Sequence, residues 1–350
     1  MTGGNGRARG APPEPQDRPA AAGSRHHSAA GAGESAPPAV VRIGTRASEL
    51  ALRQARQVAA ALAAVGVASE LVTYTTVGDR RLDQPLSAIG AKGLFTAELE
   101  ADLLAGRTDC CVHSLKDLPT DSPPGLAVVA QLRREDPRDA LVVAPGVRAR
   151  SLAELPAGAR VGTSSLRRRA QLLAARPDLD VRELRGNVPT RLRKVDEGQV
   201  DAAILAAAGL HRLELAARIA AYLDAPAWLP AAGQGAIAVQ ARASDDRLGA
   251  LLAGLDDPPT SRATAAERAF LAGLEGGCQV PIGALVTPDG TLHGLIADVT
   301  GRRVLHGATA LGADPATAGR ALAAELRGRG ADDILRGLAR LTPLPAPQPE

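Results

Sequence analysis

Residues 160–166 read RVGTSSL: a short strand, then Gly-Thr and two serines, then a helix expected over Leu166–Ala175. Residues 43–49 read IGTRASE and repeat this order, between a strand expected at Ala39–Ile43 and a helix expected at Glu49–Val65. In each stretch a serine can cap a helix N-terminus, whose free N–H groups attract anions. The repetition predicts two α/β domains, each offering a helix N-terminus to an anion.

The rest of the chain extends this pattern and adds a third unit. Further strands are expected at Leu71–Val77, Asp109–Leu115, Leu126–Leu132, Ala140–Ala144 and Ala236–Gln240, with a helix at Leu94–Ala105. Towards the C-terminus we expect a helix before residue 274, strands at 280–286, 291–299 and 302–311, and helices at 315–327 and 332–341. Turn signals at residues 288–290 and 300–301 separate these strands, which predicts a small α+β domain with an antiparallel sheet.

The expected domain boundaries follow from composition and element order. Residues 1–38 are rich in Gly, Ala and Pro and lack hydrophobic periodicity, which predicts a disordered N-terminal tail. We expect a discontinuous α/β domain at 39–136 and 232–256, and a second α/β domain at 137–231. An α+β domain is expected at 257–341, followed by a short tail at 342–350.

Composition narrows the classes of function. Aromatic residues make up 1% of the 350 residues and the net charge is +3, which disfavours the stacking platforms of nucleic-acid binders. Three cysteines argue against a disulfide framework and indicate a reducing compartment, so we expect a cytoplasmic protein. No apolar run approaches membrane-spanning length, and neither a metal-ligand spacing nor a nucleotide-binding glycine loop is present. We expect a monomer without membrane or nucleic-acid partners.

Arginine supplies most of the positive charge, and it is concentrated in one region. The chain has three lysines, Lys92, Lys116 and Lys194, among 41 basic residues. Residues 160–194 hold nine arginines and one lysine against three acidic residues. Because arginine binds carboxylates through paired hydrogen bonds, this excess favours a substrate with several carboxylates.

Two arginine pairs in this region are expected to differ in role. Arg167 and Arg168 begin a helix, where positive charge opposes the helix dipole, so we expect a ligand anion to compensate them. Arg176 and Arg182 are expected on a solvated face.

Residues 274–283 read LEGGCQVPIG and place a thiol, Cys278, at a helix-to-strand junction. A free cysteine is more often a small buried residue, but the glycine pair before it favours a nucleophile that a ligand can approach. Cys110 and Cys111 lie in an expected buried strand and are expected in the core. His113 is the one reasonable base for a Cys–His catalyst, and we expect it to be structural.

Seven ordered motifs now carry a resemblance to a known family, from about residue 41 to residue 341. They are IGTRAS at 43–48, GAKGLF at 90–95, HSLKDLP at 113–119, REDPRD at 134–139, GTSSLRR at 162–168, LRGN at 184–187 and LEGGCQVPIG at 274–283. The chain resembles the porphobilinogen deaminase (hydroxymethylbilane synthase) family. Glu49 and Pro189 depart from the family pattern, in which a proline and a small residue are common at these positions.

The resemblance implies a fold and an activity. It implies two similar periplasmic-binding-protein-like α/β domains around a cleft, plus a smaller C-terminal α+β domain with a three-stranded antiparallel sheet. It also implies that four porphobilinogen molecules are joined head to tail with release of ammonia, giving the linear tetrapyrrole hydroxymethylbilane of haem biosynthesis. The enzyme would be a transferase.

The resemblance also implies site residues. Cys278 would hold a dipyrromethane cofactor through a thioether, and Asp117 would contact pyrrole N–H groups and stabilise cationic azafulvene-like intermediates. Acetate and propionate groups would be bound by Arg46, Arg167, Arg168, Arg185, Arg191 and Arg212, with help from Ser48, Lys92, Lys116, Ser165 and Gln234. Phe95 either stacks near the cofactor or packs in the core.

Two other classes of protein compete with this interpretation. A non-catalytic, two-domain anion-binding protein would suit the two α/β units, but it has no use for Cys278. A nucleic-acid binder is disfavoured by the scarcity of aromatic residues and the nearly balanced charge. A covalent dipyrromethane would add mass at one thiol, whereas either competitor predicts the mass of the bare chain.

Overall fold

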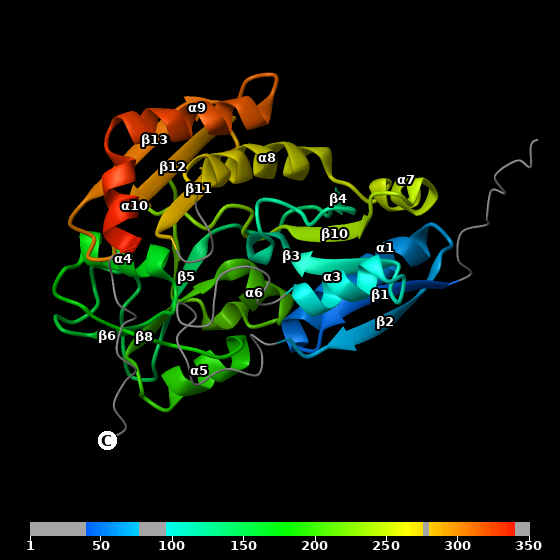
Figure 1. Ribbon diagram of the computed structural model, residues 1–350. Coiled ribbons are helices and arrows are strands. Elements are labelled where there is room, and N and C mark those ends of the chain that lie inside the picture. The colour runs from blue at the N-terminus through cyan, green and yellow to red at the C-terminus, as the bar shows by residue number, and fades with distance from the viewer. Residues whose placement is uncertain (1–39, 77–95, 276–279, 340–350) are drawn as a thin grey trace, which may run out of the picture. The chain divides into compact units, whose positions relative to one another are not determined.

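The computed structural model describes residues 40–76, 96–275 and 280–339, which form three sheets with helices packed around them (Figure 1). The strands are β1 (Val40–Arg46), β2 (Ala68–Tyr74), β3 (Cys110–Ser114), β4 (Leu126–Gln131), β5 (Asp139–Val143), β6 (Arg160–Gly162), β7 (Asp180–Arg182), β8 (Ala202–Ala206), β9 (Ala221–Leu223), β10 (Ile237–Arg242), β11 (Ile282–Val286), β12 (Thr291–Ala297) and β13 (Val304–Ala310). The α-helices are α1 (Glu49–Ala64), α3 (Ala97–Leu104), α4 (Leu166–Ala175), α5 (Val188–Asp196), α6 (Ala207–Arg212), α7 (Asp246–Ala253), α8 (Pro258–Gly273), α9 (Pro315–Gly328) and α10 (Ala331–Ala339). Two 3-10 turns, η2 (Leu115–Asp117) and η3 (Ala216–Arg218), complete the described elements.

Two five-stranded sheets share one spatial arrangement of strands, and the repeated sequence pattern had predicted two α/β units. Sheet A has the order β2-β1-β3-β10-β4 and sheet B the order β7-β6-β8-β5-β9. In sheet A, β1 is parallel to β2 and β3, while β10 is antiparallel to β3 and β4. In sheet B, β6 is parallel to β7 and β8, while β5 is antiparallel to β8 and β9. Strands β1 and β6 occupy equivalent places in the two sheets, and each leads through a serine into a capped helix.

The expected elements lie close to the observed ones, with differences at their ends. Helix α4 has the expected bounds, and α1 ends one residue early, at Ala64. Strand β2 begins three residues before the expected Leu71, because Ala68 already pairs with Val40 of β1. Helix α5 was not expected; Asn187 caps it by accepting a hydrogen bond from the Thr190 N–H at 2.9 Å.

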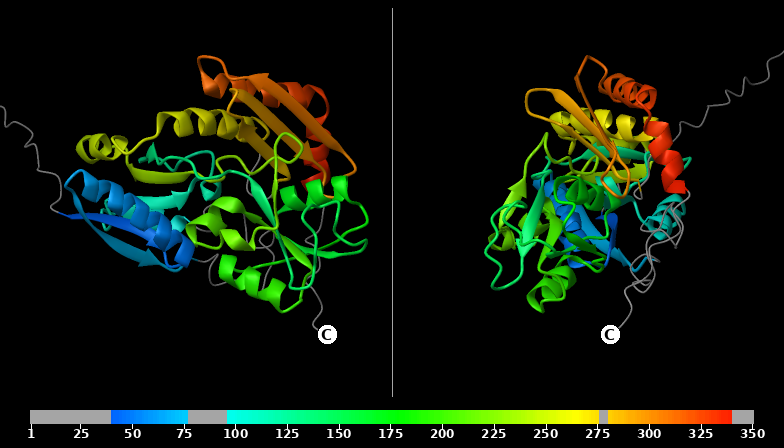
Figure 2. Two further views of the ribbon diagram at one scale, coloured as in Figure 1. Left: turned by 180° about the vertical axis from the view of Figure 1, so that it is seen from behind. Right: turned by 90° about the vertical axis from the view of Figure 1, so that its left-hand side faces the viewer.

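Sheet C is the small antiparallel sheet that the C-terminal sequence predicted, in the order β11-β12-β13. Helices α8 and α9 pack on one face of it through Phe270, Leu322 and Leu326, and Figure 2 shows both helices beside the sheet. The other face carries Leu285 and Leu295, which pack with Ala170 of helix α4. The fold class expected from the sequence, two α/β domains and a smaller α+β domain, is confirmed.

Cys110 and Cys111 are fully buried free thiols in β3, as expected. Among the described helices, none is long and apolar enough to cross a bilayer.

Candidate functional site

The chain passes between sheets A and B twice, and the two crossings lie in direct contact. The Glu135 N–H of the first crossing donates a hydrogen bond to the Gly235 carbonyl of the second at 3.2 Å. Gly235 has a φ of +90°, and a Cβ there would lie 2.3 Å from the Glu135 carbonyl oxygen. Glycine is required here both for its backbone conformation and for the close approach.

A cavity of about 90 Å³ lies beside these crossings, between elements of both α/β domains. Four cationic side chains line it: Lys116 follows β3 in η2, Arg168 lies in the first turn of α4, Arg191 in α5 and Arg212 at the end of α6. Neutral polar groups of Gln54, Ser114 and Gln234 complete its polar lining. No acidic side chain is among the described residues that line the cavity. Its described lining is therefore positively charged and would favour an anionic ligand.

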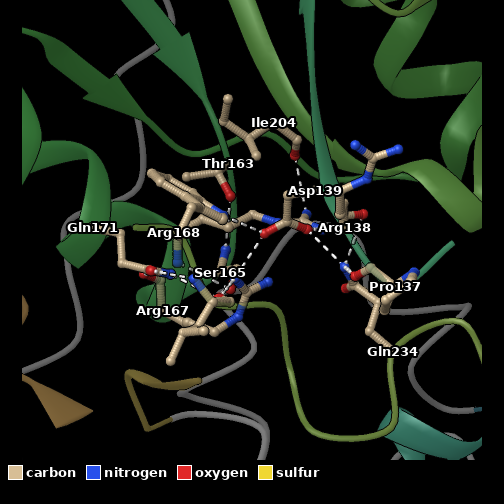
Figure 3. A network of polar contacts seen from close by, with 12 residues as sticks. Pro137, Arg138, Asp139, Thr163, Ser165, Arg167, Arg168, Gln171, Ile204 and Gln234 are labelled. Atoms are coloured by element: carbon tan, nitrogen blue, oxygen red, sulfur yellow. Dashed lines mark hydrogen bonds and ion pairs between the residues drawn. The ribbon is translucent and has the colours of Figure 1, made fainter. Parts of the chain in front are cut away.

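One carboxylate, that of Asp139, holds the arginines behind this cavity (Figure 3). Asp139 is fully buried at the start of β5. The Arg168 Nη2 donates to Asp139 Oδ1 at 2.7 Å, and the Arg167 Nη1 donates to Oδ2 at 2.7 Å. The Trp228 indole N–H donates to Oδ2 at 2.8 Å, and the Gln234 amide donates to Oδ1 at 2.9 Å. Asp139 is thus the common acceptor for four side chains.

Gln234 connects this buried network to the cavity. Its amide oxygen accepts a hydrogen bond from the Lys116 ammonium at 3.2 Å, while its nitrogen donates to Asp139 and to the Pro137 carbonyl at 2.8 Å. A single neutral side chain therefore orients the lysine relative to the arginine cluster.

Burial and mutual repulsion lower the pKa of several cations at this site. Burial lowers the pKa of Lys116 to about 8. Burial lowers the pKa of Arg191 to about 10, helped by the charge of Arg168. Burial also lowers the pKa of Arg212 to about 10. A bound anion would stabilise the charged form of each group and so raise its pKa again.

Burial and neighbouring charges act on the pKa of Asp139 in opposite directions. Burial alone would raise the pKa of Asp139, but the charges of Arg167 and Arg168 outweigh it and hold the pKa well below its usual range. Asp139 therefore stays ionised and neutralises one of the two arginine charges.

Two arginines near the site keep buried donors that have no hydrogen-bond partner within the described part of the chain. They are Arg212, at Nε, and Arg185, at Nη1. Arg212 also donates through Nη2 to the Gly235 carbonyl at 2.7 Å, which fixes its direction. A buried unsatisfied donor is costly, so such groups in a cation-lined site fit a ligand with several carboxylates.

Five of the described candidate residues line the cavity, namely Lys116, Arg168, Arg191, Arg212 and Gln234. Arg167 does not line it and donates instead to Asp139 and the Leu229 carbonyl. Ser48 and Ser165 are helix caps, accepting hydrogen bonds from the Ala51 and Arg168 N–H groups at 3.4 Å. Arg191 is oriented by its Nε–H, which donates to the Gly186 carbonyl at 2.7 Å. Lys92, Phe95 and Cys278 lie outside the described residues.

Asp117 ends the η2 turn directly after Lys116 and is partly exposed. Its negative charge favours the charged forms of both Lys116 and Arg191. The carboxylate thus acts electrostatically on the cavity that those two cations line. Arg46 is partly exposed at the end of β1.

His113 is buried, and burial lowers its pKa to about 4. Among the described residues, no contact is observed between this neutral imidazole and a thiol. This agrees with the structural role expected for it.

Sequence reasoning missed Asp139, Gln54 and Ser114. Gln54 of α1 donates to the Ser114 hydroxyl at 2.9 Å, and both side chains line the cavity. Asp139 had one available signal: it is an acidic residue at the head of a buried apolar strand, in a chain with two adjacent arginines that need an anion.

The expectation that Arg176 lies on a solvated face is wrong. Its Nη1 donates to the carbonyls of Leu152 and Ala153 at 2.7 and 3.1 Å, and its Nη2 donates to Leu155 at 3.1 Å. Arg176 instead ties the end of α4 to the preceding loop. Arg182 is exposed and pairs with Asp180, as expected.

Comparisons with known proteins agree with these features. A family model described as "Porphobilinogen deaminase, dipyromethane cofactor binding domain" matches residues 41–250, and the model of the C-terminal domain of porphobilinogen deaminase matches residues 262–328. Porphobilinogen deaminase of Roseiflexus castenholzii is 52% identical over 300 residues, which cover 84% of this chain and 98% of that protein. Porphobilinogen deaminase of Syntrophotalea carbinolica is 52% identical over 311 residues, covering 87% and 98%.

Solved structures with more distant likeness include the methionine binding protein MetQ. It is 14% identical, with a TM-score of 0.41, and the match covers 68% of this chain and 95% of that one. The periplasmic aliphatic sulphonate binding protein SsuA from Escherichia coli is 15% identical, with a TM-score of 0.39, covering 68% and 76%. The family models and the relatives at 52% identity settle the classification: this chain belongs to the porphobilinogen deaminase family.

Proposed function

We propose that porphobilinogen polymerisation by this chain takes place at the cation-lined cavity between sheets A and B. The chain is a transferase of tetrapyrrole biosynthesis that joins porphobilinogen into hydroxymethylbilane with loss of ammonia. The observation that carries the site is the gathering of Lys116, Arg168, Arg191 and Arg212 around one cavity without an acidic side chain among its described lining. A non-catalytic anion-binding role is not favoured, because the chain shares 52% identity with porphobilinogen deaminases.

The cofactor of this family is dipyrromethane, held through a thioether, and we propose Cys278 as its attachment point. When bound, the cofactor supplies the primer to which substrate units are added. Its acetate and propionate carboxylates suit the chemistry of the cavity, where Arg212 Nε is a buried donor without a partner in the described residues.

Asp117 is proposed as the catalytic carboxylate. A fixed anion stabilises positive charge that develops as ammonia leaves, and the side chain can also move a proton. Lys116 is proposed to bind a substrate carboxylate while it keeps its hydrogen bond to Gln234. The Asp139 carboxylate is proposed to position Arg167 and Arg168 for the same task, because it accepts hydrogen bonds from both guanidinium groups.

The remaining proposed binding residues are Arg46, Ser48, Lys92, Phe95, Ser165, Arg185 and Gln234. The helix caps made by Ser48 and Ser165 support this set, since each hydroxyl stands at a helix N-terminus that attracts anions.

We also propose the domain division 39–136 with 232–256, 137–231 and 257–341. Its support is that β10 returns to sheet A after all of sheet B has been formed. A monomeric protein is proposed because large exposed hydrophobic side chains in the described residues are scattered, at Val40, Val65 and Leu104. A cytoplasmic location is proposed because three cysteines in 350 residues indicate a reducing compartment.

The test of the site uses two arginines of the same helix. Arg191→Leu removes a cavity cation, and we expect kcat/KM for porphobilinogen to fall about 10²-fold, as for a desolvated charge pair. Arg193→Leu is the matched control, since Arg193 is exposed on α5 and pairs only weakly with Glu197 at 3.6 Å. Intact-mass measurement reports the cofactor content of both variants. Equal activities in the two variants would place the reaction elsewhere.

A further inference from the structure

Helix α8 reaches across to the segment that carries Asp117. The guanidinium of Arg268, half-buried on α8, donates from Nη1 to the Leu115 and Leu118 carbonyls at 3.4 and 3.2 Å. Its Nη2 donates to the Pro119 and Thr120 carbonyls at 2.6 and 3.2 Å. One side chain therefore holds four carbonyls of a six-residue segment.

That segment has little internal structure to fix its direction. The η2 turn is three residues long, and its closing hydrogen bond runs from the Leu118 N–H to the Leu115 carbonyl at 3.2 Å. The Leu115 N–H also donates to the Ala236 carbonyl of the second crossing at 3.0 Å, and Leu115 and Leu118 are buried. These contacts fix the two ends of the turn on the sheet A side. The carbonyls on either side of Lys116 and Asp117 are held by Arg268.

The part of α8 that carries Arg268 is held in place by the preceding residue, Glu267. Glu267 is fully buried, and both of its carboxylate oxygens accept hydrogen bonds. Its carboxylate accepts hydrogen bonds from Arg134 at 2.7 and 2.9 Å. It also accepts from the Gly233 N–H at 2.8 Å and the Val286 N–H at 2.9 Å. Helix α8 is therefore joined to both crossings and to sheet C. The backbone that carries Arg268 is held in a fixed position relative to them.

We propose that Arg268 is a positioning residue for the reaction: from α8 it sets the direction of the Lys116-Asp117 turn towards the cavity. The proposal rests on the catalytic role proposed above for Asp117. The guanidinium suits this task because its planar group of N–H donors can hold several acceptors in one geometry, whereas an ammonium acts as a point charge. Within the described part of the chain, the hydrogen bonds of Arg268 run to backbone oxygens of this segment, so we expect it to act through the turn that carries Asp117.

The test compares Arg268→Gln with Arg262→Gln. Arg262 is an exposed arginine of the same helix that donates to the Ala313 and Gly312 carbonyls, away from the cavity. For Arg268→Gln we expect kcat to fall about 10- to 10²-fold, the typical effect of a misplacement near 1 Å, with KM changed little. Arg268→Lys should recover part of this loss. Arg262→Gln should leave kcat unchanged.

A second comparison separates this proposal from the one on which it rests. In an Asp117→Asn background, Arg268→Gln should lower single-turnover ammonia release by less than about 3-fold, since residues that act as a unit are not additive. Equal fold-losses in both backgrounds, or a rise in KM alone, would overturn the positioning role. Wild-type turnover in Asp117→Asn alone would instead overturn the catalytic role of Asp117. If Arg268→Gln does not fold, Arg268→Lys carries the test, and an unchanged kcat in that variant would refute the proposal.

Discussion

Asp139 and Arg168 form a buried ion pair in which Oδ1 accepts from Nη2 at 2.7 Å and from Nε at 3.1 Å. The second carboxylate oxygen, Oδ2, accepts one hydrogen bond from Arg167 Nη1 at 2.7 Å. One buried anion against two buried cations leaves a net positive charge beside the cavity. The pair therefore stabilises the fold and retains part of the positive charge available to a ligand.

We expect Asp139→Asn to destabilise the protein by about 3–5 kcal/mol, because two buried arginines lose their counter-charge while the shape of the side chain is kept. Urea unfolding, followed by circular dichroism, measures this. The pKa of Asp139 is depressed in the folded state, so its contribution is present above the unfolded pKa of about 4 and is lost as pH falls below it. The variant should accordingly lose part of the wild-type dependence of stability on acid pH.

Asp180→Asn is the control for that prediction, since Asp180 pairs with Arg182 on the surface. Its unfolding midpoint should stay close to that of the wild type. Similar midpoints for Asp139→Asn and Asp180→Asn would mean that the Asp139 network contributes little to folding.

We expect the activity to depend on pH through Lys116. Its pKa of about 8 means that the cavity loses a positive charge as pH rises through 8, so kcat/KM should fall between pH 7 and 9. Asp117 and Arg168 face this ammonium with opposite effects on its pKa. In Lys116→Met the activity at pH 7 should be lower and that alkaline fall should be absent. An unchanged alkaline limb in Lys116→Met would assign it to another group.

The same shift has a defined sign for stability. Because the pKa of Lys116 in the folded state is below its ordinary value of 10.5, its protonation disfavours folding. The penalty is fully present below pH 8 and is relieved as pH rises towards 10.5. Unfolding free energies of the wild type should therefore rise relative to those of Lys116→Met over that interval.

We expect Asp117→Asn to lower single-turnover ammonia release about 10²- to 10³-fold, because the amide keeps the size of the carboxylate but cannot offset developing positive charge. Asp117→Glu should retain more activity, since it keeps the charge and changes only its position. The measurement uses cofactor-loaded protein whose fold is checked by circular dichroism. Turnover of the Asn variant within a few-fold of wild type would leave Asp117 with a structural role.

We expect Cys278→Ser to fold but to carry little or no thioether-linked dipyrromethane, because a hydroxyl is a much weaker nucleophile than a thiolate at neutral pH. Intact mass gives the cofactor content, and peptide mapping of the wild type locates the modified residue. An adduct on Cys110 or Cys111 would contradict both this assignment and the burial of those two thiols.

Local sequence signals were sufficient to predict many of the elements and the presence of two α/β units. Serine caps, glycine turns and apolar periodicity act over a few residues, so helix α4 and the three strands of sheet C could be located without knowledge of the rest. The resemblance to known sequences then identified Lys116, Arg168 and Gln234, which the structure brings together.

The charge balance of the site could not be predicted in this way. Asp139 lies 28 and 29 residues from the arginines it pairs with, and 89 and 95 residues from Trp228 and Gln234. The local sequence pattern does not indicate which acidic side chain pairs with which basic one in the folded chain. Arg176 was misjudged for the same reason, because the carbonyls that it binds in addition to Asp178 lie 21 to 24 residues earlier.

The position of β10 has a consequence for the order of events during synthesis on the ribosome. This strand lies between β3 and β4, yet it follows every strand of sheet B in the sequence. Until residue 242 leaves the exit tunnel, β4 has no neighbour in sheet A, and β3 keeps an open edge. All strands of sheet B have been synthesised once residue 223 is added, so this sheet can form first. We therefore expect sheet B to form before sheet A is complete, with the nascent edge of β3 exposed to mispairing during the interval.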